Sequence, residues 1–171
     1  MPGPAVPQAA CTLYALALAV EILRRRFPAF EEIVLSRAGL MLKPGEERSV
    51  LAATQMLAGV AIVFVLFQRP IAVLAIAFLA LGDPAASAVG RFAGTHRFFG
   101  KSLQGTAAFL ATSWAAGTVL LATGLEVAWP VMVAGATAAA IIEASPTKLD
   151  DNLTVPIGSA IAMLGVFALL G

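Results

Sequence analysis

Charged and small residues that could bind a phosphate group gather in residues 82–106 of an otherwise apolar chain. Three polar residues recur there every four positions, namely Asp83, Ser87 and Arg91. The second half of the stretch brings glycines, a lysine and a serine: Gly94, Gly100, Lys101, Ser102 and Gly105. Glycine and lysine at the start of a helix favour anion binding, because backbone N–H groups then point at the ligand. The stretch is a candidate phosphate-binding segment, although its spacing differs from that of a P-loop.

The same stretch carries signals for a helix boundary. Asp83 is a good N-cap residue, and Pro84 suits the first helical position, where a missing N–H loses no hydrogen bond. We therefore expect the preceding apolar run to break at residues 82–84 and a new helix to start there. Small residues follow at intervals of four: Gly82, Ala86, Gly90 and Gly94. In a membrane such a stripe lets helix backbones approach closely, so a kinked membrane helix with a basic loop is the simplest structural explanation.

A second polar group lies in residues 142–156. Glu143 closes one apolar run, and Asp150, Asp151 and Asn152 open the next. We expect Asn152 or Asp151 to cap the following helix, which leaves the other acids unexplained. At one membrane surface, the acids of both stretches can converge near Lys101: Asp83, Glu143, Asp150 and Asp151. This combination suits Mg²⁺ that holds a nucleotide, because Mg²⁺ favours one or two carboxylates plus phosphate oxygens and water.

The composition indicates the environment of the chain. Its 171 residues are 60% hydrophobic and 12% charged, with a mean hydropathy of +0.90. These values are too apolar for an ordinary water-soluble domain, so we expect an integral membrane protein with one transmembrane domain over residues 1–171. The net charge is +1 and the basic residues lie in short loops, so no nucleic-acid partner is expected. Cys11 is the single cysteine, which leaves no disulfide within the chain, and we interpret it as a packing residue.

Six apolar segments predict an all-α, polytopic helical bundle with about six transmembrane segments: 9–23, 50–67, 71–90, 103–123, 127–142 and 153–170. The first has about 15 residues and would be short or tilted. Because Arg24 to Arg26 follow this segment instead of preceding it, we expect a retained span and no signal peptide. Residues 24–49 show apolar residues at helical spacing, namely Phe30, Ile33, Val34, Ala38 and Met41. They predict one amphipathic helix at the membrane surface, with Glu31, Glu32, Arg37 and Lys43 on its solvated face.

Positive charges predict the orientation of the chain in the membrane. Lysines and arginines gather in the first, third and fifth loops, and the opposite side holds only Arg69. These loops are therefore expected in the cytoplasm and both termini outside, which puts the polar clusters at the cytoplasmic face; we expect the membrane to be the cell inner membrane. The small-residue stripes suit contacts within one chain or between the chains of a homo-oligomer.

Taken in chain order, the motifs of the two polar stretches resemble those of the CTP-dependent lipid-alcohol kinases. The resemblance rests on Gly82-Asp83, Ala86-Ser87, Gly90, Gly94, the run from Lys101 to Gly105, Glu143, and the run from Asp151 to Pro156. This family contains dolichol kinase, phytol kinase and the eukaryotic diacylglycerol kinase, and is related to the CDP-diacylglycerol synthases. The resemblance covers about residues 47–156.

The resemblance implies a Mg²⁺-dependent enzyme that transfers the γ-phosphoryl group of CTP, or of another nucleoside triphosphate, to a polyprenol, a phytol-like alcohol or a diacylglycerol. Asp83, Lys101 and Asp151 would carry catalysis. Asp83, Glu143 and Asp151 would be metal ligands, or one of the two aspartates would accept the substrate proton. The nucleotide would be bound by Ser87, Gly90, Gly94, Lys101, Ser102, Gly105 and Asn152.

Two features depart from the pattern of this family. Gln104 stands where members usually have Glu, and an amide can hydrogen-bond but cannot neutralise a cation. Many relatives also carry an Arg-Lys-x-x-His pattern in an earlier helix, which this sequence lacks. The single histidine, His96, is expected to be a loop residue at the membrane interface.

Two other functions remain open. A CTP-dependent phosphatidate cytidylyltransferase would share the stretch rich in glycine and lysine, but the run from Asp151 to Pro156 follows the kinase pattern. The chain also lacks a Gly-His-Gly-Gly segment near an Asp-Arg pair. A non-enzymatic membrane protein or small transporter is the third possibility, and the inverted repeats typical of transporters are not found between the two halves. The acceptor lipid is not specified, because isoprenoid and diacyl pockets are lined by the same apolar residue types.

Overall fold

The computed structural model describes residues 5–38, 51–146 and 149–170. In these ranges the chain forms seven helices: α1 (Ala5–Arg26), α2 (Pro28–Ala38), α3 (Ala52–Leu66), α4 (Arg69–Phe92), α5 (Leu103–Ala122), α6 (Trp129–Ala144) and α7 (Asp151–Leu170). Two short strands, β1 (Arg97–Phe98) and β2 (Lys101–Ser102), form a hairpin between α4 and α5. The prediction of an all-helical protein is confirmed, with this hairpin as an addition.

Four helices are long and apolar enough to cross a membrane: α1, α4, α5 and α7. Helices α3 and α6 are also apolar but have only 15 and 16 residues. At 1.5 Å per residue they extend about 22 to 24 Å, which is less than the hydrocarbon core of about 30 Å. The chain is therefore a helical membrane protein with four candidate spans, and the predicted count of six is not confirmed.

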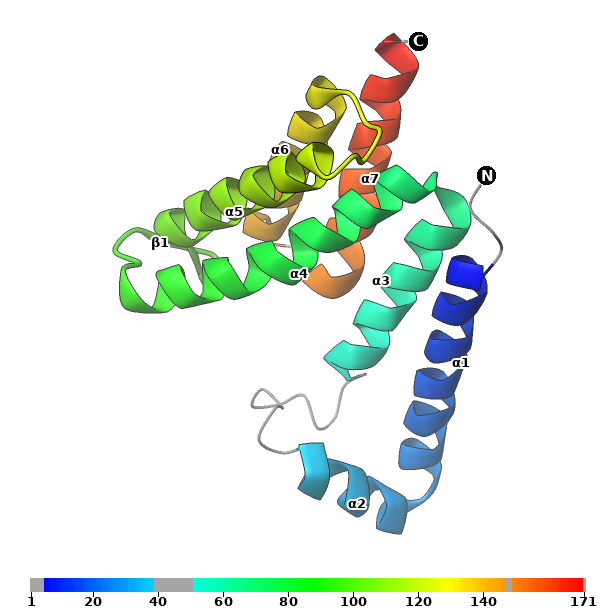
Figure 1. Ribbon diagram of the computed structural model, residues 1–171. Coiled ribbons are helices and arrows are strands. Elements are labelled where there is room, and N and C mark those ends of the chain that lie inside the picture. The colour runs from blue at the N-terminus through cyan, green and yellow to red at the C-terminus, as the bar shows by residue number, and fades with distance from the viewer. Residues whose placement is uncertain (1–4, 39–50, 147–148, 171) are drawn as a thin grey trace.

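The helices pack as neighbouring antiparallel pairs (Figure 1). Helices α4 and α5 form one pair, and α6 and α7 form a second pair against it. Helix α3 contacts α7 and α1, while α1 packs mainly against α3 and α2. The long helices alternate in direction, so the start of α1 and the end of α7 lie at one end of the molecule (Figure 1). The core lies among α3 to α7, where Phe78, Phe109, Met132 and Met163 are fully buried.

Helix α4 runs without interruption through residues 82–84, so the predicted helix break there is wrong. Pro84 lacks the N–H that would bond one turn back, which normally weakens a helix. However, α4 buries one face from Ile71 to Ala86, and it packs against α5, α6 and α7. This burial outweighs the local cost of proline. Asp83 is consequently a side chain inside a helix and not an N-cap.

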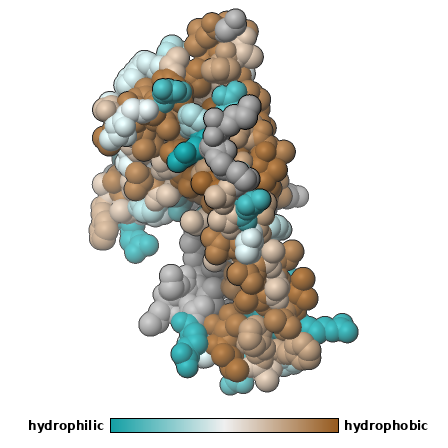
Figure 2. Space-filling view, turned by 45° about the vertical axis from the view of Figure 1, so that its right-hand side comes forward, coloured by the Kyte–Doolittle hydropathy of each residue, from teal (hydrophilic) through white to brown (hydrophobic). Residues whose placement is uncertain are grey.

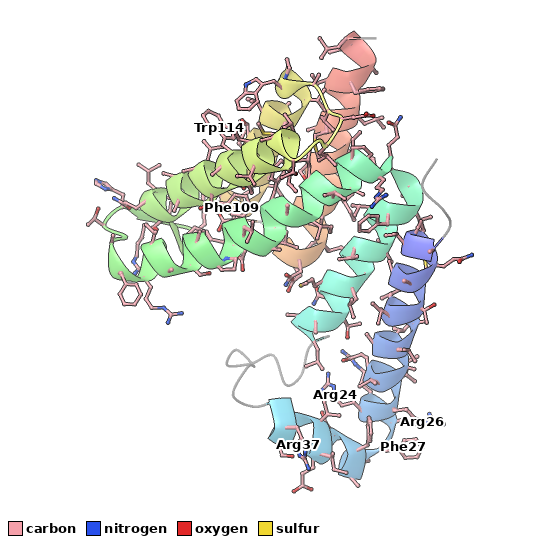
Figure 3. All side chains as sticks on the ribbon, in the orientation of Figure 1. Arg24, Arg26, Phe27, Arg37, Phe109 and Trp114 are labelled. Atoms are coloured by element: carbon pink, nitrogen blue, oxygen red, sulfur yellow. The ribbon has the colours of Figure 1, made fainter. Side chains whose placement is uncertain are left out.

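The small-residue stripe of α4 packs closely on α5, as predicted. Phe109 of α5 lies against Gly82, where an added Cβ atom would meet its ring at 2.8 Å (Figure 3). Nearer the hairpin, a Cβ atom on Gly105 of α5 would meet the carbonyl oxygen of Ala86 at 2.9 Å. The two backbones can approach this closely only because side chains are absent at the contacts.

An ion-pair cluster joins α1 to α2. Arg24 Nη2 and Arg25 Nε each donate to Glu21 Oε1 at 2.7 Å. Arg24 is 1% exposed, and its Nη1 also donates to Glu31 of α2 at 3.1 Å. Figure 3 shows Arg24 at the corner between the two helices. The interpretation of Arg24 as a loop charge is therefore wrong, because Arg24 is buried in α1 and its pair with the 40% exposed side chain of Glu31 joins the two helices.

Helix α2 confirms a helix within residues 24–49 over Pro28–Ala38. Met41 and Lys43 lie outside the described residues, and placement of α2 at a membrane surface stays a prediction. Helix α1 has 22 residues and is not short, contrary to expectation. Much of the visible surface is hydrophobic (Figure 2), and Leu16 of α1 and Ile33 of α2 are 60% and 58% exposed. Such a surface suits contact with lipid.

Candidate active site

A polar cavity of about 390 Å³ lies between α4, the hairpin and the start of α5. Its charged lining residues are Asp83, Arg91, Arg97, Lys101, Glu143 and Asp151. The other lining residues are Ala86, Ser87, Gly90, Gly100, Ser102, Gly105 and Thr106. We call this the first cavity. It brings residues of both polar sequence stretches together, with three cations and three carboxylates on its wall.

Lys101 connects the elements around the first cavity. Its Nζ donates to Glu143 Oε1 at 2.8 Å and to Asp151 Oδ2 at 2.7 Å, across sequence separations of 42 and 50 residues. Burial lowers the pKa of Lys101, but the hydrogen bonds with Asp151 and Glu143 raise it by more, so the pKa lies above its ordinary value. Lys101 is therefore a permanent ammonium at neutral pH, which suits it to bind anions and not to accept a proton.

Glu143 is the most deeply buried acid of the first cavity, at 3% exposure. Within the described residues its second oxygen, Oε2, makes no hydrogen bond, and neither does the buried Oγ1 of Thr106. Buried polar atoms in proteins nearly always have a partner. Both atoms are buried, and both belong to residues that line the first cavity.

A second cavity of about 210 Å³ adjoins the first. The two cavities share Asp83, Lys101 and Asp151. The second is completed by residues of the hairpin and of the α6–α7 connection: Phe99, Ser145, Pro146, Leu149, Asp150 and Asn152. The three residues predicted to be catalytic therefore lie on the common wall of two cavities.

Asp150 caps α7, so the expectation that Asn152 or Asp151 would do so is wrong. Asp150 Oδ1 accepts hydrogen bonds from the backbone N–H of Asn152 at 2.9 Å and from its side-chain Nδ2 at 2.7 Å. Because α7 begins at Asp151, the residue before it is the one whose side chain reaches the second helical N–H. Capping by Asp150 leaves the carboxylate of Asp151 to Lys101.

Ser102 caps α5, since its Oγ accepts a hydrogen bond from the N–H of Gly105 at 3.0 Å. The glycines of α4 and its end pack against this serine. Added Cβ atoms at Gly90 and Gly94 would meet Ser102 Oγ at 3.0 and 2.9 Å. Packing of α4 on α5 thus explains these glycines, which were predicted to admit a nucleotide.

The hairpin that carries Lys101 turns at Phe99 and Gly100, with φ angles of 46° and 82°. Phe98 pairs with Lys101, so the turn has two residues, and positive φ at both matches a type I′ turn. The sequence pattern predicted only a basic loop here. The usual Asn-Gly or Asp-Gly signal is absent, because the chain has Phe at the first turn position.

The side chain of Gln104 forms hydrogen bonds with the loop that follows α4, and it lines neither cavity. Its Oε1 accepts from the N–H of Thr95 at 3.2 Å, and its Nε2 donates to Thr95 Oγ1 at 2.6 Å. His96 is exposed in the same loop, as expected. An uncharged amide performs this role fully, and Gln104 lies outside the first cavity, so its lack of charge does not alter the charge of that cavity.

Most predicted site residues line the first cavity, namely Asp83, Ser87, Gly90, Lys101, Ser102, Gly105, Glu143 and Asp151. Asn152 lines only the second cavity, and Gly94 lines neither. Three further lining residues had no predicted site role: Arg91, Arg97 and Thr106. For Arg91 a signal existed, because it continues the spacing of four from Asp83 and Ser87. The place of Arg97 depends on the hairpin, which has no clear sequence signal.

The predicted metal ligands Asp83, Glu143 and Asp151 share the first cavity without forming a ready metal site. Among the described residues, no three Asp, Glu, His or Cys side chains form a group that could hold a metal ion. Glu143 and Asp151 nevertheless come within hydrogen-bond distance of one cation, the Lys101 ammonium. Their oxygens fit Mg²⁺ in the form common at nucleotide sites, with one or two carboxylates plus phosphate oxygens and water.

No family model matches the sequence, and no curated protein and no solved structure matches it either. The functional interpretation therefore depends on the motifs and on the geometry of the two cavities.

Proposed function

We propose that the protein is a membrane lipid kinase that transfers the γ-phosphoryl group of CTP, or of another nucleoside triphosphate, to the hydroxyl group of a membrane lipid alcohol. The observation that supports this proposal best is the first cavity. There, Lys101 bridges Glu143 and Asp151, and Asp83 lies on the same wall. The residues that resemble the kinase motifs thus share one cavity although they lie far apart in sequence.

The cations of the first cavity supply the charge that a polyphosphate needs. Arg91, Arg97 and Lys101 line it together. Arginine binds phosphate oxygens with two parallel N–H groups, and lysine acts as a point charge. The start of α5 also faces the cavity through Gly105 and Thr106. The dipole of α5 favours an anion at this helix start, where the N–H groups of Leu103 and Gly105 already donate to the carbonyl oxygen of His96 and to Ser102 Oγ.

Glu143 and Asp151 are the residues that would hold Mg²⁺, together with phosphate oxygens and water. When bound, the ion would supply neutralisation of the phosphate charge and of the leaving group. Lys101 would contribute its fixed positive charge beside the same phosphates. Phosphoryl transfer depends mainly on such positioning and charge neutralisation, so the site needs no strong protein nucleophile.

In the proposed reaction, the lipid hydroxyl oxygen attacks the γ-phosphorus of CTP. The bond between that phosphorus and the oxygen bridging to the β-phosphate breaks, and CDP leaves with the bond's electron pair. The proton of the hydroxyl group passes to the carboxylate of Asp83 or Asp151, which line both cavities. The products are a phosphorylated lipid, CDP and one proton.

We place this site at the cytoplasmic face of a six-crossing protein, in the cell inner membrane, with both termini outside. The alternating directions of α1, α3, α4, α5, α6 and α7 support this topology (Figure 1). The basic residues Arg91, Arg97 and Lys101 near the hairpin agree with the excess of positive charge in cytoplasmic loops. The short helices α3 and α6 would cross where the bilayer thins locally.

The direct test of the reaction uses the purified protein in detergent with Mg²⁺, γ-labelled CTP or ATP, and dolichol, phytol, farnesol or diacylglycerol. The proposal predicts label in a lipid and formation of the nucleoside diphosphate. Pyrophosphate and a CDP-lipid, formed from CTP and phosphatidate, would instead show a cytidylyltransferase. If neither reaction occurs, the non-enzymatic function is favoured.

A further inference from the structure

The two cavities differ in charge. In the first, Arg91, Arg97 and Lys101 balance three carboxylates. Of the described residues that line the second, Lys101 is the single cation, and Asp83, Asp150 and Asp151 line it too. By the charges of the described lining residues, the first cavity attracts a polyphosphate more than the second does. A neutral hydroxyl group in the second meets carboxylates that accept its hydrogen bond.

The wall of the second cavity also contains exposed apolar residues. Phe99 is 75% exposed and Leu149 is 64% exposed, and Pro146 lines the same cavity. Clustered exposed apolar side chains commonly mark a binding surface for an apolar partner. A polar cavity whose wall also holds these apolar side chains suits a molecule that joins a hydroxyl head to a hydrocarbon chain.

The backbone of Phe99 supports a binding role for its ring. Its φ of +46° lies in the left-handed region, which bulky residues avoid and which Asn or Gly adopts readily. The first position of this turn would therefore favour Asn over Phe. The ring makes an edge contact with Phe98 at a centroid distance of 6.5 Å and remains largely exposed. Turn formation does not explain a phenylalanine at this position, whereas contact with an apolar ligand does.

Resting on the proposed kinase function, we infer that the second cavity binds the hydroxyl end of the lipid alcohol and that Phe99 contacts the adjoining part of its hydrocarbon chain. Asp83, Lys101 and Asp151 line both cavities. When the γ-phosphoryl group of the nucleotide lies at these three residues, the rest of the triphosphate lies in the first cavity. The lipid hydroxyl group in the second cavity then faces the γ-phosphorus. In-line transfer requires this opposed arrangement of leaving group and acceptor. Phe99 is thus a specificity residue for the acceptor.

The kinetic test is the variant Phe99→Asn, which suits the turn better than the native residue and so keeps the fold. For the lipid alcohol that the wild type phosphorylates, we expect its KM to rise about tenfold, the usual scale for loss of an apolar contact, with the nucleotide KM unchanged. Phe92→Asn is the matched control, because Phe92 is 86% exposed and lines neither cavity, and its kinetics should equal those of the wild type. A raised nucleotide KM with an unchanged lipid KM in Phe99→Asn would make the second cavity a nucleobase site and overturn the inference.

A second test does not need turnover. Farnesol and a diacylglycerol, each with a diazirine near the hydroxyl group, are cross-linked to the full chain in detergent. We expect label on peptides that contain Phe99 or Leu149, and its loss in Phe99→Asn. No label, or label confined to the apolar groove between α4 and α5 at Leu81 and Val119, would contradict the inference. If the wild type is labelled as expected but transfers no phosphoryl group, the kinase function fails while the lipid site stands.

Discussion

At the scale of single residues, the hydrogen bonds of Lys101 stabilise the candidate site. If the Lys101 amine is removed, neither carboxylate oxygen of the buried Glu143 has a hydrogen-bond donor within the described residues. Leaving a buried polar group unsatisfied in this way costs about 1–3 kcal/mol of folding free energy. We therefore predict that Lys101→Ala lowers the free energy of unfolding of the protein in detergent by this amount, and with it the melting temperature. Adding Glu143→Gln should restore part of it, because no buried charge then remains unpaired. An unchanged melting temperature in Lys101→Ala would contradict this role.

The pKa of Lys101 also predicts how stability depends on pH. Because its folded pKa is raised above the ordinary value of 10.5, the stabilisation is fully present below pH 10.5 and is lost as pH rises through the higher folded pKa. Thermal unfolding between pH 7 and pH 12 should therefore show a loss of stability that begins only above about pH 10.5. In Lys101→Arg this loss should be smaller, since arginine keeps its proton there. Equal losses in both proteins would show that other groups cause the effect.

Residue types and spacing predicted the acids and Lys101 of the site, because carboxylates in an apolar chain are costly and stand out. They did not show that Glu143 is buried or that Asp150 is the cap. Those facts depend on where α6 ends and α7 begins, and helix ends shift by one or two residues without a sequence signal.

At the scale of helices, the contact between α4 and α5 supports the first cavity and depends on missing side chains. A methyl group on Gly105 would meet the carbonyl oxygen of Ala86 at 2.9 Å. We predict that Gly105→Ala destabilises the protein by about 1–3 kcal/mol, the usual cost of overpacking, and lowers activity by shifting α5. Gly165→Ala is the matched control, because a Cβ atom on Gly165 in α7 meets no atom within 4 Å. Equal thermal stability of both variants would show that the contact is not tight.

Hydrophobic runs located the helices, but two local signals failed. Asp83 and Pro84 form a good N-terminal motif, yet α4 continues because its burial against three helices outweighs the local preference. Phe99 is a poor residue for a two-residue turn, yet the hairpin forms. A single sequence cannot show either result, since both depend on contacts made by distant parts of the chain.

At the scale of the whole molecule, composition predicted a helical membrane protein, while the number of crossings depends on α3 and α6. Single cysteines in a Cys11→Ser background distinguish the two topologies. With six crossings, Ser36→Cys lies in the cytoplasm and Glu126→Cys outside. With four crossings by α1, α4, α5 and α7, both lie on one side. We predict that an impermeant maleimide labels Glu126→Cys in intact cells and Ser36→Cys only after permeabilisation, and labelling of both together would refute six crossings.

The central claim is that the residues shared by the two cavities carry phosphoryl transfer. The measurement that tests it most directly is the rate at which γ-label passes from CTP to lipid in Asp83→Asn and Asp151→Asn, with Glu126→Gln in the distant α5–α6 loop as control. We predict losses in kcat of at least about a hundredfold in both aspartate variants, with folding intact, and a normal rate in the control. Rates near that of the wild type in both Asp83→Asn and Asp151→Asn would contradict the assignment of this site.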